Sequence, residues 1–132
     1  MSAPLVEFPD TEALIINWLP GALTAQGMPG IKVAGTKPGT GAESVVVYRT
    51  GGAMRDFLTD RATIGFDVRA VTATRCVAII NKVHALMFQL QGLALAGHAT
   101  DEVEETRGVT SDPLPPEDPI RYSMLLTITV RA

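Results

Sequence analysis

The stretch Ala62–Gly92, ATIGFDVRAVTATRCVAIINKVHALMFQLQG, decides the fold because its hydrophobic pattern changes period near the middle. From Ala62 to Val71, apolar and polar residues alternate, which predicts a strand with one face in the core. From Ala73 to Gln91, apolar residues recur at a spacing of about 3.6 residues, which predicts a long helix. A strand that leads directly into an amphipathic helix indicates a layered domain of helices and sheet.

The predicted long helix has clear ends and an unusually wide apolar surface. Thr72 or Thr74 can act as the N-cap, and Gly92 is placed to terminate the helix. At about 100° per residue, its apolar arc spans roughly 200°, more than a helix resting on one sheet needs. The centre of this arc is formed by Cys76, Ile80, Val83, Met87 and Leu90, and its flanks by Ile79, Leu86, Val77, His84 and Phe88. Val77 and Phe88 are therefore candidate contact residues.

Before this stretch, the sequence predicts one helix and two further strands. The helix starts after the N-cap Asp10 and is closed by Pro20-Gly21, and Ala22–Pro29 is a connector. The strands are Ile31–Gly35 and Ser44–Thr50, the second buried on both faces because it holds three consecutive valines. The predicted loops are Thr36–Glu43, which includes Gly39 and Gly41, and Ala53–Asp60, which follows the interruption at Gly51-Gly52.

After the long helix, the sequence predicts two more strands. Leu93–Gly97 is a connector, and Thr100–Arg107 is rich in glutamate, as expected of a charged edge strand. Asp112–Pro119 holds four prolines and is an extended loop. Ile120–Arg131 alternates from end to end and predicts a long final strand.

These elements predict a single α+β domain over residues 1–132. Their order is helix, three strands, helix, two strands, written α-β-β-β-α-β-β. We expect a mixed or antiparallel sheet of about five strands with both helices packed on one face. With 132 residues, two domains would each approach the lower limit for a stable core.

Composition excludes several classes of function. The net charge is −3 with no run of either sign, which argues against wrapping nucleic acid and against a polybasic membrane anchor. No apolar run approaches the roughly 20 residues needed to span a bilayer, and Met1–Pro4 does not open a signal peptide. Cys76 is the single cysteine, so we expect no internal disulfide and synthesis in a cytosol.

No pattern in the sequence predicts an enzyme, a cofactor site or a metal site. His84, His98 and Cys76 lack partners at catalytic or metal-ligand spacing, so each is interpreted as structural. Gly35–Gly41 resembles a phosphate-binding loop only faintly, because it leads into a strand. Glu102, Glu104 and Glu105 are interpreted as a solvated edge.

What remains is a large capacity for contacts. The wide helix arc, the strands with apolar residues on both faces and three long loops favour an obligate oligomer over a monomer.

Short motifs along most of the chain point to one family. They are Phe8-Pro9-Asp10 before a helix ending Trp18-Leu19-Pro20, Tyr48-Arg49-Thr50-Gly51-Gly52, Asp60-Arg61-Ala62 before Phe66-Asp67-Val68-Arg69-Ala70, and Ser111-Asp112-Pro113-Leu114-Pro115 before Arg121-Tyr122. In order and spacing the chain resembles the tail-terminator (tail completion) proteins of long, non-contractile-tailed bacteriophages, as found among phages of actinobacteria.

The resemblance implies a structural virion protein that is made in the host cytoplasm and sits at the head-proximal end of the tail. Such proteins form a hexameric ring that caps the tail tube, stops its polymerisation and joins it to the head-completion (stopper) protein. DNA passes through the lumen without specific binding. The implied partners are thus further copies of the chain, the tail tube protein and the stopper.

By hypothesis, the sheet face bearing Asp67, Arg69 and Arg121 contacts neighbouring subunits, and the glycine-containing loops meet the tube or the stopper. The candidate interface residues are Arg49, Gly51, Gly52, Arg55, Asp56, Asp60, Arg61, Asp67, Arg69, Arg121, Val77 and Phe88. Two alternatives stay open: another head-tail connector or minor tail protein, and a small-molecule-binding regulatory domain, which would need a concave polar pocket.

Overall fold

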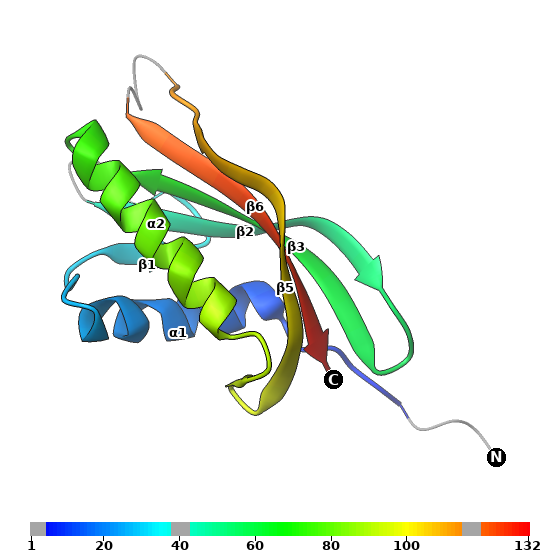
Figure 1. The fold of residues 1–132 in the computed structure, drawn as a ribbon. Helices are drawn as coiled ribbons and strands as arrows, with labels where there is room; N and C mark the ends of the chain where they lie inside the picture. Colours follow the sequence, from blue (N-terminus) through cyan, green and yellow to red (C-terminus); the bar gives the residue numbers. More distant parts are fainter. Residues whose placement is uncertain (1–4, 38–42, 115–119) are drawn as a thin grey trace.

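The computed structural model describes residues 5–37, 43–114 and 120–132. In these residues the elements are, in chain order, α1 (Thr11–Ala25), β1 (Lys32–Ala34), β2 (Ser44–Met54), β3 (Thr59–Arg69), α2 (Ala73–Gln89), β4 (Ala94–Leu95), β5 (His98–Ser111) and β6 (Arg121–Arg131). The predicted α+β class and element order are confirmed, with one strand more than expected (Figure 1).

The strands of the described residues form one sheet in the order β1-β2-β3-β6-β5-β4. β1 runs parallel to β2, and every other neighbouring pair is antiparallel. The long strands β3 and β6 lie at the centre of the sheet. β2 and β1 follow on one side and β5 and β4 on the other, so the short strands β1 and β4 are the edge strands. Both helices lie on one face of the sheet (Figure 1), so its other face carries no layer from the described part of the chain.

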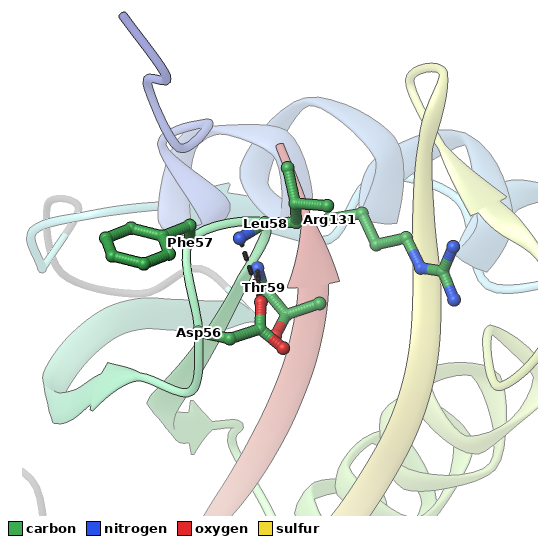
Figure 2. A pocket seen from close by; sticks show the side chains of 5 residues that line it. All are labelled: Asp56, Phe57, Leu58, Thr59 and Arg131. Atoms are coloured by element: carbon green, nitrogen blue, oxygen red, sulfur yellow. Dashed lines mark hydrogen bonds between the residues drawn. The ribbon is translucent and has the colours of Figure 1, made fainter. Parts of the chain in front are cut away.

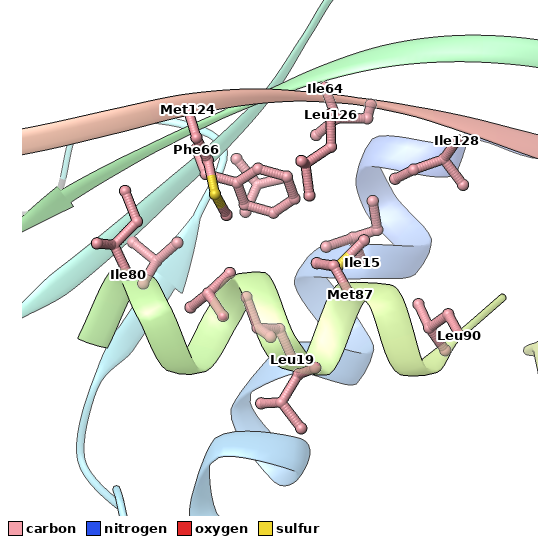
Figure 3. Close-up of a cluster of buried hydrophobic side chains, with 14 of the residues drawn as sticks. Ile15, Leu19, Ile64, Phe66, Ile80, Met87, Leu90, Met124, Leu126 and Ile128 are labelled. Atoms are coloured by element: carbon pink, nitrogen blue, oxygen red, sulfur yellow. The ribbon is translucent and has the colours of Figure 1, made fainter. Parts of the chain in front are cut away.

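The core lies between this sheet and the two helices. Ile64 and Phe66 of β3 face the helices beside Met124 and Leu126 of β6, with which they are in register (Figure 3). The helices contribute buried side chains at helical spacing: Ile15, Leu19 and Leu23 from α1, and Cys76, Ile79, Ile80, Val83, Leu86 and Met87 from α2. Most of β3 and all of α2 lie in the stretch Ala62–Gly92, so this stretch supplies the centre of the core.

The long helix matches its prediction closely. Thr72 is the N-cap and accepts a hydrogen bond from the backbone N–H of Arg75 at 3.2 Å. Gly92 has a φ of +81°, the left-handed conformation that commonly follows a helix end. The flanking residues Val77 and Phe88 are half-buried, so the wide apolar arc is only partly covered.

The first helix is longer than predicted, because Pro20 does not end it. Proline lacks the N–H of one helical hydrogen bond, but Leu23 in the next turn is fully buried and holds the helix against the core. The Thr24 hydroxyl also donates to the Pro20 carbonyl at 2.9 Å. The helix ends at Ala25, and Gly27 adopts a φ of +77° just beyond it. The prediction of a connector over Ala22–Pro29 was therefore wrong for residues 22–25, which belong to the helix.

The segment Gly51–Asp60 was also predicted wrongly. Gly51-Gly52 does not interrupt the strand: β2 continues to Met54, and the turn to β3 spans only residues 55–58. A shift in register between Arg49 and Gly51 absorbs an extra residue, as in a β-bulge. A Cβ on Gly52, whose φ is +92°, would lie 1.9 Å from the Arg61 carbonyl oxygen. Glycine here permits close strand pairing rather than a break.

The connector after α2 contains an extra short strand. Ala94 and Leu95 pair with Ala99 and His98 around a two-residue turn, in which Ala96 and Gly97 both have positive φ. Leu95 is 1% exposed and anchors this small hairpin. β5 is correspondingly longer than the predicted Thr100–Arg107.

The predicted loops Thr36–Glu43 and Asp112–Pro119 lie partly outside the described residues, including Gly39 and Gly41. In the described part of the chain, no helix is long and apolar enough to cross a membrane.

Candidate assembly surface

The β2–β3 hairpin extends beyond the helices as an arm, defined here as Arg49–Asp60 (Figure 1). From Arg49 to Leu58 every residue is exposed, although β2 and β3 remain paired. Met54, Phe57 and Leu58 at the end of the arm have exposed fractions of 56%, 80% and 62%. Three large apolar side chains in solvent at one tip are a common mark of a contact surface.

The turn at the tip is held in a defined shape. Asp56 Oδ1 accepts hydrogen bonds from the backbone N–H groups of Leu58 and Thr59 at 2.8 and 2.9 Å. The backbone bond from Leu58 is the main cause that lowers the pKa of Asp56 below its ordinary value. The Ala132 N–H donates to the Leu58 carbonyl at 2.9 Å, which ties the turn to the end of β6. The tip therefore presents its apolar residues from a fixed backbone.

An open hollow of about 380 Å³ lies at this turn and is lined by residues 56–59 and Arg131. Figure 2 shows Phe57 and Arg131 pointing in opposite directions, and its dashed lines show the two bonds to Asp56.

The base of the arm is fixed to the body of the domain by Arg49. Its guanidinium forms two hydrogen bonds to the carboxylate of Asp60, at 2.7 and 3.0 Å, and Asp60 is only 4% exposed. This pairing is the main cause that raises the pKa of Arg49. The backbone N–H of Arg49 donates to Glu12 Oε2 at 3.0 Å, which links the arm to the first turn of α1. A bidentate arginine–carboxylate pair of this kind fixes orientation as well as charge.

The sheet face opposite the helices, called here the bare face, carries a polar network. Asp67 accepts a hydrogen bond from the Tyr48 hydroxyl and forms an ion pair with Arg121, both at 3.0 Å. Arg121 also binds the carboxylate of Asp112 at 2.9 Å, and Ser123 donates to the same carboxylate at 3.1 Å. The Asp67 and Arg121 side chains are only 11% and 12% exposed. The Asp67–Arg121 pair is therefore largely withdrawn from solvent, although no described layer covers this face.

Tyr48 owes its position to a glycine on the neighbouring strand. Its ring lies over Gly65, where a Cβ would come within 2.4 Å of two ring carbons. Burial and the neighbouring Asp67 raise the pKa of Tyr48 from 10.0 to about 12.

The bare face has a second, more open part near the arm. Arg61 there pairs with Glu104 at 3.3 Å, and the hydroxyls of Thr63 and Thr127 lie 3.2 Å apart. A hollow of about 460 Å³ lies here and is bordered by Arg55, Arg61, Thr63 and Thr127, among others.

The twelve candidate interface residues do not form one patch. The structure groups Arg49, Gly51, Gly52, Arg55, Asp56 and Asp60 on the arm, with Arg61 beside them; Asp67, Arg69 and Arg121 lie together at the far end of β3 and β6; and Val77 and Phe88 lie on α2. The last two belong to the helix layer and do not reach the arm. Phe88 packs against the His84 ring, with ring centroids 4.7 Å apart.

The sequence interpretation missed Met54, Phe57 and Leu58, which are the most prominent apolar residues of the arm. The signal was present, because these residues interrupt a segment that is otherwise charged or small. It also missed Tyr48 and Asp112 as partners of Asp67 and Arg121. Pairing across strands so distant in sequence becomes visible only when the sheet order is known.

Other chemically notable residues are in structural positions. Cys76 is fully buried, its thiol lies 3.1 Å from the Val68 carbonyl, and burial raises its pKa. Among the described residues, no three His, Cys, Asp or Glu side chains gather where they could hold a metal ion.

Comparison with known proteins adds no further assignment: no protein-family model matches the chain, and no curated protein matches it either.

Proposed function

We propose that this protein is a phage tail terminator: a structural subunit that assembles into a ring, caps the tail tube, stops its polymerisation and joins it to the head-completion protein. The observation that carries the proposal is the arm with its exposed apolar tip, on a chain whose motifs resemble that family. The ring, the tube and the head-completion protein are all parts of this proposal.

The arm supports an assembly role on energetic grounds. Burying apolar surface contributes about 25 cal/mol per Å², so leaving Phe57 and Leu58 in water forgoes stabilisation that a partner would recover. The tip is also preorganised by Asp56 and by the Arg49–Asp60 pair at its base. A fixed tip loses little conformational entropy on docking, which favours affinity. We therefore assign the contact with a neighbouring subunit or with the tube to the arm.

The polar network of the bare face has a different role in this proposal. Asp67 and Arg121 already pair within the chain, so they have little charge to offer a neighbour. Their network holds the unlayered face of the sheet in shape. The mild net charge of −3 agrees with a lumen through which DNA passes without being held.

The role of the arm is tested by comparing two variants with the wild type by native mass spectrometry. Phe57→Ser removes an apolar side chain that is 80% exposed, and Val71→Ser removes one that is 78% exposed but lies far from the arm. We expect Phe57→Ser to shift the oligomer towards single subunits, with Val71→Ser unchanged. Equal behaviour of both variants would remove the arm from the interface.

A further inference from the structure

β2 and β5 have uncovered edges beyond the short outer strands β1 and β4, and these two edges are protected to very different degrees. The outer edge of β5 carries Glu102, Glu104 and Glu105, and three irregularities interrupt its register with β6. Charge and bulges are the usual means by which proteins prevent unwanted strand pairing. The edge of β2 has only one such irregularity in its pairing with β3, between Arg49 and Gly51. From Thr50 to Met54 its sequence is TGGAM, with no charged residue and no proline.

This stretch of β2 has no strand beside it in the described part of the chain. β1 covers β2 only from Ser44 to Val46, and Glu12 accepts the N–H of Arg49. The remaining edge, Thr50–Met54, pairs with β3 on one side only, and both of its faces are exposed. An unprotected edge of this kind is suited to receive a strand.

A second segment of the chain has the complementary properties. Leu5–Phe8, of sequence LVEF, belongs to no helix or strand, and no backbone hydrogen bond joins it to another described residue. Leu5 is 87% exposed and Val6 is 41% exposed. Pro9 restricts Phe8 to extended backbone, so the segment is biased towards the conformation of a strand.

We propose that Leu5–Phe8 of one copy of this chain adds as a strand to the edge Thr50–Met54 of a second copy. The two segments have similar lengths, and each supplies the backbone groups that the other lacks. Leu5 and Val6 would cover apolar surface near Met54, Phe57 and Leu58.

Charge complementarity supports the same pairing. Arg55, at the end of this edge, is exposed to solvent. Glu7 is likewise exposed and lies within the added segment. An acidic side chain in the strand and a basic one beside the edge favour the correct partner and register.

The pairing is between copies because neither element covers the other within one chain. Leu5 and Phe57 are 87% and 80% exposed, so neither side chain is largely covered within the single subunit. A segment that meets a different surface on the next copy makes a heterologous contact, which closes into a ring or continues as a filament. The inference rests on the proposed ring assembly and names the contact that would build it.

Disulfide trapping tests this pairing directly. Val6→Cys and Ala53→Cys each place a thiol at an exposed position, whereas Cys76 is fully buried and does not compete. After mild oxidation, the mixture of the two variants should give covalent dimers that neither variant gives alone. Val6→Cys mixed with Val71→Cys, exposed but distant, is the control and should give none.

Three outcomes would overturn the pairing. A Val6→Cys/Ala53→Cys chain that forms only an internal disulfide would place the strand within one copy. Dimers from Ala53→Cys alone would show that two β2 edges pair with each other. Rings seen by electron microscopy without cross-links in the mixture would refute this contact and leave the proposed function standing. Cross-links in a protein that never caps tail tubes would support the contact and contradict the function.

Discussion

Replacing Asp67 with alanine should destabilise the fold substantially, although Asp67 lies on a sheet face without a covering layer. The change removes the acceptor of the Tyr48 hydroxyl and one of the two carboxylates bound to Arg121. Arg121 is 12% exposed, so water can solvate its guanidinium only in part. In the variant, the largely buried guanidinium of Arg121 keeps only one of its two carboxylate partners, Asp112.

The size of the effect follows from these contacts. A neutral hydrogen bond contributes about 1 kcal/mol and one to a charged group about 1.5–3 kcal/mol. Removing one partner of a fully buried ion pair costs about 3–5 kcal/mol. Because Asp112 still binds Arg121 and some solvent reaches the site, we expect a loss of about 2–3 kcal/mol in the free energy of unfolding.

Urea denaturation followed by circular dichroism measures this loss, with Asp101→Ala as the matched control. Asp101 also pairs with an arginine, Arg131, but these side chains are 30% and 60% exposed. An exposed ion pair contributes less than about 1 kcal/mol. If Asp67→Ala were no more destabilising than Asp101→Ala, the network would not stabilise the bare face. Asp67 would then be free to serve contacts between subunits, as the sequence had suggested.

Three further predictions follow from the same contacts. Because burial and Asp67 raise the pKa of Tyr48 to about 12, its contribution to stability is complete below pH 10 and declines as the pH rises towards 12; the absorbance of tyrosinate should show its late ionisation, and Asp67→Ala should bring that ionisation to lower pH. Because the pKa of Asp56 is lowered, its hydrogen bonds stabilise the turn fully above the ordinary pKa of 3.8, and this stabilisation is lost as the pH falls through the folded pKa. In an NMR titration the carboxyl resonance of Asp56 should therefore have its midpoint below pH 3.8. Gly52→Ala places a Cβ against a backbone carbonyl at positive φ and should cost at least about 1–2 kcal/mol in thermal unfolding. The control Gly51→Ala, which meets nothing within 4 Å, should cost little, and equal effects of the two changes would contradict the bulge geometry.

The sequence predicted the centre of the fold well because local pattern and tertiary environment agree there. The buried apolar side chains of β3, β6 and α2 lie on one side of each element, so alternation and helical spacing are visible directly in the sequence. Thr72 and Gly92 then mark the helix ends by ordinary capping preferences.

Errors occurred where a tertiary contact overrides a local preference. Pro20 predicts a helix end, but the buried Leu23 holds the next turn in place. Gly52 predicts a break, but close approach to Arg61 requires a residue without a side chain in a continuous hairpin. Neither contact is encoded in neighbouring residues, so sequence pattern alone could not reveal them.

The candidate surface was predicted in part for a similar reason. Arg55 and Asp56 were expected in a loop and lie in the turn at the end of the arm, whereas Arg49 was expected in a strand and lies in β2 at the base of the arm. The sequence shows Phe57 as an apolar residue in a charged segment, but this pattern alone does not decide between an exposed and a buried side chain.

The most direct test of the central claim is electron microscopy of the purified protein incubated with phage tail tubes. The proposed function predicts rings of about six subunits in the protein alone, the number implied by the family resemblance, and tubes capped at one end after mixing. Single subunits at every concentration, together with tubes that remain uncapped and continue to grow, would contradict it.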